Sequence, residues 1–189
     1  MGNSRITIQT AENRNFECGI LYPGKPAKCC QLIDGMKMSI FLVQHALALP
    51  REMDPAKGIS EEGQTDTERI ASVAKGYHVR VNKIQHSGKK RARQTAEIFE
   101  QVLKPEAGIE ASLGLNPLDD VADFGKSLNP SVNDMIVSHL PFLEKLTSWL
   151  IIGKTDQSVF KFQNGGIVCL DKAPEDKHWH IKWTLMPKI

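Results

Sequence analysis

The chain has 189 residues, enough for one domain that buries roughly 70% of its unfolded surface without disulfides or a structural metal. Its 24 basic and 22 acidic residues are interspersed and give a formal charge of +2. This balance excludes a general electrostatic attraction to nucleic acid or to an anionic membrane, so any basic function has to be local.

The sequence contains no recognisable export or membrane signal. No apolar run reaches the roughly 20 residues that a membrane helix needs, and the N-terminus lacks the charged and then apolar layout of a signal peptide. The cysteines, Cys18, Cys29, Cys30 and Cys169, form no CxxC pair and are too few for a disulfide scaffold. We therefore expect reduced thiols and a cytoplasmic protein.

Residues 1–36 differ in character from the rest of the chain. They include Asn, Gly and Pro, show no sustained periodicity, and end where Met36 or Met38 would be a natural domain start. We predict that residues 1–36 are a poorly ordered N-terminal extension or lie upstream of the true start codon; a small docking or regulatory segment is the alternative. Residues 37–189 then form the single folded domain.

The first half of this domain alternates strand and helix patterns. The continuous apolar run 39–44 predicts a buried strand, as in parallel sheets that are covered on both faces. Residues 60–75 predict a helix, because a serine cap and two glutamates precede the apolar spacing. A strand is predicted over 79–86 and a second helix over 89–103.

The second half continues this alternation and then changes. It predicts a short helix over 120–128, a strand over 135–138 and a helix over 142–151. Short strands bounded by turns are predicted over 159–162, 166–171 and 179–185. Together these elements predict an α/β fold, a three-layer α/β/α sandwich whose mainly parallel sheet gains antiparallel C-terminal edge strands.

Histidines follow two of the predicted buried strands. His45 comes directly after strand 39–44, and His139 comes directly after strand 135–138. Functional groups of parallel sheets collect just beyond the carboxyl ends of the strands. We therefore predict that both histidines lie at the functional edge of the sheet.

A third segment has the features of a phosphate site. Ser87 and Gly88 form a turn between a predicted strand and a predicted helix, and Arg91 lies in or near the first turn of that helix. Exposed amides at a helix start attract anions, and a guanidinium adds a planar, charged fork. Four cations within residues 89–93 also fit a solvated basic face, so this segment alone leaves both interpretations open.

Together, these segments resemble the histidine phosphatase superfamily, the phosphoglycerate-mutase-like group, and within it the SixA-type phosphohistidine phosphatases. The matching motifs are VQHA at 43–46, GISEEG at 58–63, HSGKKRARQTAEIF at 86–99, VSHLPFL at 137–143, and GGIVCLDK at 165–172 with the closing WHIKWTL. The resemblance runs from about Met38 to Pro187. Residues 1–36 lie outside it.

The resemblance implies a phosphatase with definite residue roles. His45 corresponds to the nucleophile that attacks phosphorus, Arg91 to the family's second arginine, and His139 to its second histidine, which would serve best when protonated. It further implies double displacement through phospho-His45, with no metal and no other cofactor. The expected phosphate contacts are Gln44, Ser87, Gly88, Arg91 and His139.

The resemblance also implies the kind of partner. A phosphohistidine-containing protein or a small phosphate ester is expected, whereas neither nucleic acid nor a membrane is. The sequence leaves the physiological substrate and the oligomeric state open.

The chain departs from the family's opening Arg-His-Gly motif, which here is Gln44-His45-Ala46. Glutamine offers two N–H donors but no charge, and losing a buried charged partner costs about 2–5 kcal/mol, or roughly 30-fold to several-thousand-fold in rate. We therefore expect reduced activity. The alternative is a catalytically weak pseudo-phosphatase that binds phosphate or phosphoproteins. Arg51, in the loop after His45, is the candidate for a replacement cation.

Overall fold

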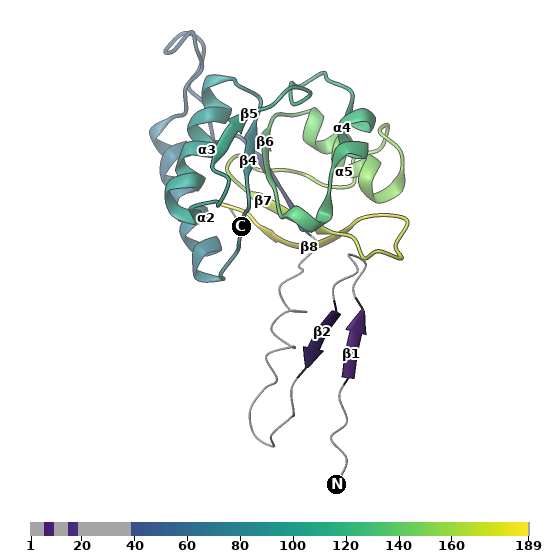
Figure 1. Ribbon diagram of the computed structural model, residues 1–189. Helices are drawn as coiled ribbons and strands as arrows, with labels where there is room; N and C mark the ends of the chain where they lie inside the picture. The colour runs from purple at the N-terminus through teal and green to yellow at the C-terminus, as the bar shows by residue number, and fades with distance from the viewer. Residues whose placement is uncertain (1–5, 10–14, 19–38, 189) are drawn as a thin grey trace. The chain divides into compact units, whose positions relative to one another are not determined.

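The computed structural model describes residues 6–9, 15–18 and 39–188, in a chain that divides into two units, Met1–Lys37 and Met38–Ile189 (Figure 1). In the first unit, β1 (Ile6–Gln9) and β2 (Asn15–Cys18) pair antiparallel. The rest of the predicted N-terminal extension, 1–36, lies outside the described residues. The second unit contains every element discussed below.

Six strands of the second unit form one sheet in the order β5-β4-β6-β3-β7-β8. They are β3 (Ser39–Gln44), β4 (Ile84–His86), β5 (Ile109–Ala111), β6 (Met135–Ser138), β7 (Ile167–Asp171) and β8 (His180–Leu185). β5, β4, β6 and β3 pair in parallel, whereas β7 pairs antiparallel with β3 and with β8. The predicted mixed sheet is confirmed, although of the two antiparallel C-terminal strands β7 lies inside the sheet and only β8 is an edge strand.

Helices cover both faces of this sheet (Figure 1). They are α2 (Glu61–Gly76), α3 (Lys90–Leu103), α4 (Val121–Ser127) and α5 (Phe142–Ile152), with a short 3-10 helix η1 (Pro130–Val132). Along β3, Phe41 and Val43 pack into a core with α2 and α3, while Ile40 and Leu42 pack into a second core with α5. Successive side chains of a strand point to opposite faces, so β3 contributes to both cores. The predicted three-layer α/β/α sandwich is confirmed.

The strand predicted over 79–86 is shorter in the structure. β4 begins only at Ile84, where its backbone amide is already paired with Gly108. Just before it, Asn82 points its side-chain amide at the carboxylate of Asp134, at 3.0 Å. The polar residues in the middle of the predicted strand therefore belong to a connecting segment.

The strand predicted over 159–162 is wrong. These residues have no strand assignment, and the rings of Phe160 and Phe162 stack edge to face with centroids 5.1 Å apart. Both rings pack against the core on the α4 and α5 side, which accounts for their apolar pattern. β5, which the sequence did not predict, is a three-residue strand paired with β4.

No helix in the part of the chain that the structure describes is long and apolar enough to cross a membrane.

Candidate functional site

The predicted site residues meet at one edge of the sheet. Because β3, β4 and β6 are parallel neighbours, their carboxyl ends lie together, and His45, Ser87 and His139 directly follow these three strands. Arg91 joins them from the first turn of α3. The two histidine rings have centroids 4.9 Å apart. The structure therefore gathers four of the predicted residues into one cluster.

His45 is held in one tautomer by its own backbone. Its Nδ1 lies 2.7 Å from the carbonyl oxygen of Ala46, so Nδ1 carries the proton and donates it. Its Nε2 accepts a hydrogen bond from Nε of Arg91 at 3.0 Å. Burial, offset in part by the Ala46 carbonyl, and the charge of Arg91 lower the pKa of His45 to about 4. His45 is therefore neutral near pH 7, with its lone pair on Nε2.

His139 is almost fully buried beside it. Its Nε2 lies 2.6 Å from Oγ of Ser87, and its Nδ1 is buried with no hydrogen-bond partner among the described residues. Burial, together with the nearby His45, Arg91 and Lys89, lowers the pKa of His139 to about 3. The protonated His139 expected from the resemblance is thus not the form that this environment favours.

Arg91 is partly buried and contacts His45. Burial lowers its pKa, but a guanidinium stays charged at neutral pH. Only its Nε is engaged, by His45; no hydrogen bond joins its two terminal amino groups to any residue the structure describes. These groups are free to form the bidentate contact that suits a phosphoryl group.

The turn after β4 needs its glycine. Gly88 has φ +79°, a conformation that other residues rarely adopt. Its amide donates to Nδ1 of His86 at 3.0 Å, so His86 holds the turn in place. The Gly88 amide, predicted to contact phosphate, is engaged in this hydrogen bond, and its phosphate contact stays a prediction.

Gln44 ends β3 as a buried residue, 9% exposed. Its Oε1 is buried and unpaired among the described residues. The replacement cation suggested for it, Arg51, is exposed in a turn and forms no ion pair or hydrogen bond with the cluster. Gln44 and Arg51 therefore add no charge to the four clustered residues.

Two residues that the sequence did not single out fix the backbone around His45. Asn164 donates from Nδ2 to the carbonyl oxygen of His45 at 2.8 Å. The amide of Ala46 donates to Oγ1 of Thr95 at 2.9 Å, and Thr95 in turn donates to the carbonyl of Arg91 at 2.7 Å. The only sequence signals were the turn dipeptide Asn164-Gly165 and the spacing of Thr95 four residues after Arg91.

The loop after His45 is attached to the start of α2. The carbonyl of Leu47 accepts from the amide of Ser60 at 2.8 Å and from its hydroxyl at 3.2 Å, and Ser60 caps α2 by accepting from the amide of Gly63 at 3.0 Å. The predicted serine cap is confirmed. A Cβ on Gly63 would lie 2.4 Å from the carbonyl oxygen of Leu47. The helix start thus fits directly under the loop that leaves His45.

One curated protein matches the chain. The phosphohistidine phosphatase SixA of Escherichia coli is 27% identical over 156 residues, which cover 79% of this chain and 94% of that protein. The chain is SixA-like, with the fold of the histidine phosphatase superfamily. No family model matches it.

Solved structures share the fold. A protein histidine phosphatase SixA complexed with tungstate superposes with a TM-score of 0.67 at 24% identity, covering 79% of this chain and 97% of that one. A mycobacterial glucosyl-3-phosphoglycerate phosphatase gives a TM-score of 0.59 at 12% identity, covering 76% and 96%. At these identities the likeness concerns the fold.

In the SixA-like domain, no three His, Cys, Asp or Glu side chains among the described residues are grouped so that they could hold a metal ion.

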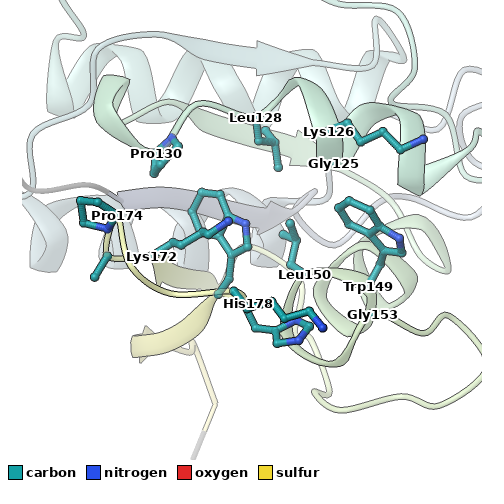
Figure 2. A pocket seen from close by; sticks show the side chains of 13 residues that line it. Gly125, Lys126, Leu128, Pro130, Trp149, Leu150, Gly153, Lys172, Pro174 and His178 are labelled. Atoms are coloured by element: carbon teal, nitrogen blue, oxygen red, sulfur yellow. The ribbon is translucent and has the colours of Figure 1, made fainter.

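A separate cavity of about 480 Å³ lies between the end of α5, the segment 125–130 and the loop 172–179 (Figure 2). Trp149 and Leu150 form part of its wall. The loop follows Asp171, which pairs with Ser39 at the start of β3, whereas His45 follows the end of β3. A six-residue strand spans about 20 Å, so this cavity lies at the opposite end of the sheet from the histidine cluster.

Proposed function

We propose that the SixA-like domain is a metal-independent phosphatase that removes phosphoryl groups from phosphohistidine in proteins, through a phospho-His45 intermediate. The observation that carries this proposal is the orientation of His45, whose protonated Nδ1 faces a backbone carbonyl while the Nε2 lone pair faces Arg91. A neutral imidazole with a fixed tautomer is a ready nucleophile toward phosphorus.

In the first step, Nε2 of His45 attacks phosphorus and the bond between phosphorus and the substrate imidazole breaks. The released imidazole nitrogen takes a proton from water. Nε of Arg91 now occupies the attacking lone pair, so Arg91 has to transfer its hydrogen bond to a phosphoryl oxygen as the substrate enters. There its charge offsets the negative charge of a loose transition state.

In the second step, water attacks the phosphorus of phospho-His45 and the bonding electrons return to Nε2. The water proton leaves with phosphate or solvent, and Nδ1 keeps its proton throughout because the Ala46 carbonyl holds it. His139 and Ser87 lie next to the same phosphoryl position and supply hydrogen bonds to its oxygens. A bound dianion would favour the protonated, donating form of His139.

A second candidate function is a pseudo-phosphatase that binds phosphate or a phosphoprotein without useful turnover. It is favoured by Gln44, which brings no charge and leaves its Oε1 buried and unpaired among the described residues. With His45 and His139 both neutral, Arg91 is left as the one charged group in direct hydrogen bond with His45 in the described part of the site. The two functions differ in rate, not in the ligand.

The test is hydrolysis of a phosphohistidine protein and of an aryl phosphate by the wild type, His45→Ala and Gln44→Arg, with the exposed His180→Ala as the control. We expect His45→Ala to abolish turnover, because no other lone pair is aligned. Gln44→Arg should raise the rate by about 10-fold or more, since a charged hydrogen bond is worth about 1.5–3 kcal/mol.

The outcomes separate the proposals. Turnover that survives His45→Ala contradicts the covalent mechanism. A wild type without measurable hydrolysis, together with clear hydrolysis by Gln44→Arg, supports the pseudo-phosphatase. The absence of phosphate affinity in every variant excludes both functions. Trapping of an acid-labile phosphoryl group on His45 checks the intermediate directly.

A further inference from the structure

We infer that Lys89 is a phosphate-binding residue of this site and supplies a second positive charge beside Arg91. The inference rests on the proposed function and deepens it by naming a side chain that the sequence analysis treated only as one of four neighbouring cations. It follows from which cations near the cluster are already paired, and from where Lys89 lies.

The first step concerns charge. A phosphoryl group in transfer carries close to two negative charges over its outer oxygens. In the structure, Arg91 is the one charged side chain among the described residues in direct hydrogen bond with His45, because burial keeps His45 and His139 neutral before a ligand binds. A second cation nearby would match the charge of an incoming phosphoryl group before His139 takes up a proton.

The second step concerns pairing. Among the cations that begin α3, Lys90 lies 2.7 Å from the carboxylate of Asp54, and Arg93 lies 3.4 Å from that of Glu97. Both are therefore directed to other partners. Neither Lys89 nor Arg91 has a carboxylate partner within the described range 39–188. These two are the cations of this segment that remain available to an anion.

The third step concerns position. Lys89 is the N-cap residue of α3, in extended backbone conformation, and its side chain is exposed. It stands two residues after Ser87, whose Oγ contacts Nε2 of His139, and two residues before Arg91. Lys89 thus lies in the chain between two residues whose side chains contact the histidines. The charge of Lys89 also helps to keep His139 neutral.

A flexible ammonium at this place differs from the fixed fork of Arg91. Lysine acts as a hydrated point charge on a long stem, so it can follow the phosphoryl group from entry to release. Because it is exposed and caps no amide with its side chain, replacing it should leave the fold intact. Its removal is therefore expected to act on phosphate binding and turnover and not on stability.

The experiment compares Lys89→Met with Arg93→Met, which removes one charge from the same helix but from a residue paired with Glu97. Hydrolysis of the aryl phosphate and calorimetric binding of inorganic phosphate are measured for both. We expect Lys89→Met to lower kcat/KM and phosphate affinity by about 10- to 100-fold, and Arg93→Met by less than about 3-fold. Lys89→Arg should retain most of both, and melting curves should coincide.

Gln44→Arg provides a second readout, because an added charge in the site should shrink the loss caused by Lys89→Met. Equal losses in Lys89→Met and Arg93→Met would overturn the inference and indicate only a long-range field. Unchanged kcat/KM and phosphate affinity in Lys89→Met would also overturn the inference. The proposed function would still be supported in that case if His45→Ala loses turnover. If the wild type has no turnover, phosphate binding decides on Lys89 alone; if it also binds no phosphate, both proposals fail.

Discussion

The tautomer of His45 comes from its immediate neighbour along the chain. The Ala46 carbonyl lies 2.7 Å from Nδ1, and Arg91 donates to Nε2. The sequence predicted which residues would meet, because apolar strands 39–44 and 135–138 are followed directly by histidines. It did not predict the tautomer, the unprotonated His139 or the Asn164 contact, because these depend on side-chain rotamers and on burial that are set only when the strands align.

The buried state of His45 has a consequence for stability. Its pKa is about 4 in the folded protein and about 6.5 in the unfolded chain, so the unfolded chain binds a proton at a higher pH. This preference destabilises the fold as the pH falls below about 6.5, and the loss is complete below the folded pKa. Between pH 8 and pH 5 it amounts to about 2 kcal/mol.

Urea unfolding of wild type and His45→Ala at these two pH values measures the effect. We expect the wild type to lose about 2 kcal/mol more than the variant between pH 8 and pH 5. Equal losses in the two proteins would mean that His45 titrates normally in the folded state.

The elements show where sequence patterns are informative. β3 and β6 were predicted correctly because continuous apolar runs have one stable place in a covered sheet. β5 was not predicted, because its three residues form a strand only through pairing with β4. Residues 159–162 were wrongly predicted as a strand, because aromatic packing in a loop gives the same apolar pattern as a strand. Short elements are determined by their partners.

The start of α2 offers a test at this scale, because it lies under the loop that leaves His45. Gly63→Ala places a methyl 2.4 Å from the backbone of Leu47, which cannot move without shifting the loop. We expect a loss of about 1–3 kcal/mol in the free energy of unfolding, together with reduced turnover, since Leu47 is two residues from His45, the proposed nucleophile.

Gly76→Ala, at the other end of the same helix, is the matched control. A Cβ there meets nothing within 4 Å, so this variant should be neutral or stabilised by up to about 1 kcal/mol. The measurements are the thermal unfolding of both variants and their rates of aryl phosphate hydrolysis. Equal stability and equal rates of hydrolysis in the two variants would show that the close approach of Leu47 to α2 does not limit stability or turnover.

At the scale of the whole molecule, the unit Met38–Ile189 holds all that the proposed chemistry uses. Both cores lie within residues 39–188 and share β3, and the cluster is built from residues that follow three strands of one sheet, His45, Ser87 and His139, and from Arg91 in the first turn of α3. From the change in character along the chain, the sequence predicts 37–189 as one domain, and this stays a prediction. The structure divides into its two units between Lys37 and Met38.

A fragment that begins at Met38 tests this independence. We expect it to unfold cooperatively at nearly the temperature of the full chain and to match the full chain's rate in the aryl phosphate assay within about 2-fold, because both cores are retained. Circular dichroism on heating and the aryl phosphate assay provide the comparison. A fragment that stays unfolded or inactive would assign residues 1–37 a part in the fold or the site.

The hydrogen bonds between Arg91 and His45 and between Ser87 and His139 have one more consequence for the proposed reaction, which concerns release of its product. Inorganic phosphate that binds here replaces hydrogen bonds that these side chains otherwise make with one another. The net free energy of phosphate binding is therefore the difference between the bonds to phosphate and the bonds within the protein. When it leaves, the side chains pair again at once. Because the site pairs some of its own polar groups in this way, we expect it to hold phosphate less tightly than a site whose groups were all unpaired, so that free phosphate competes less well with the next substrate.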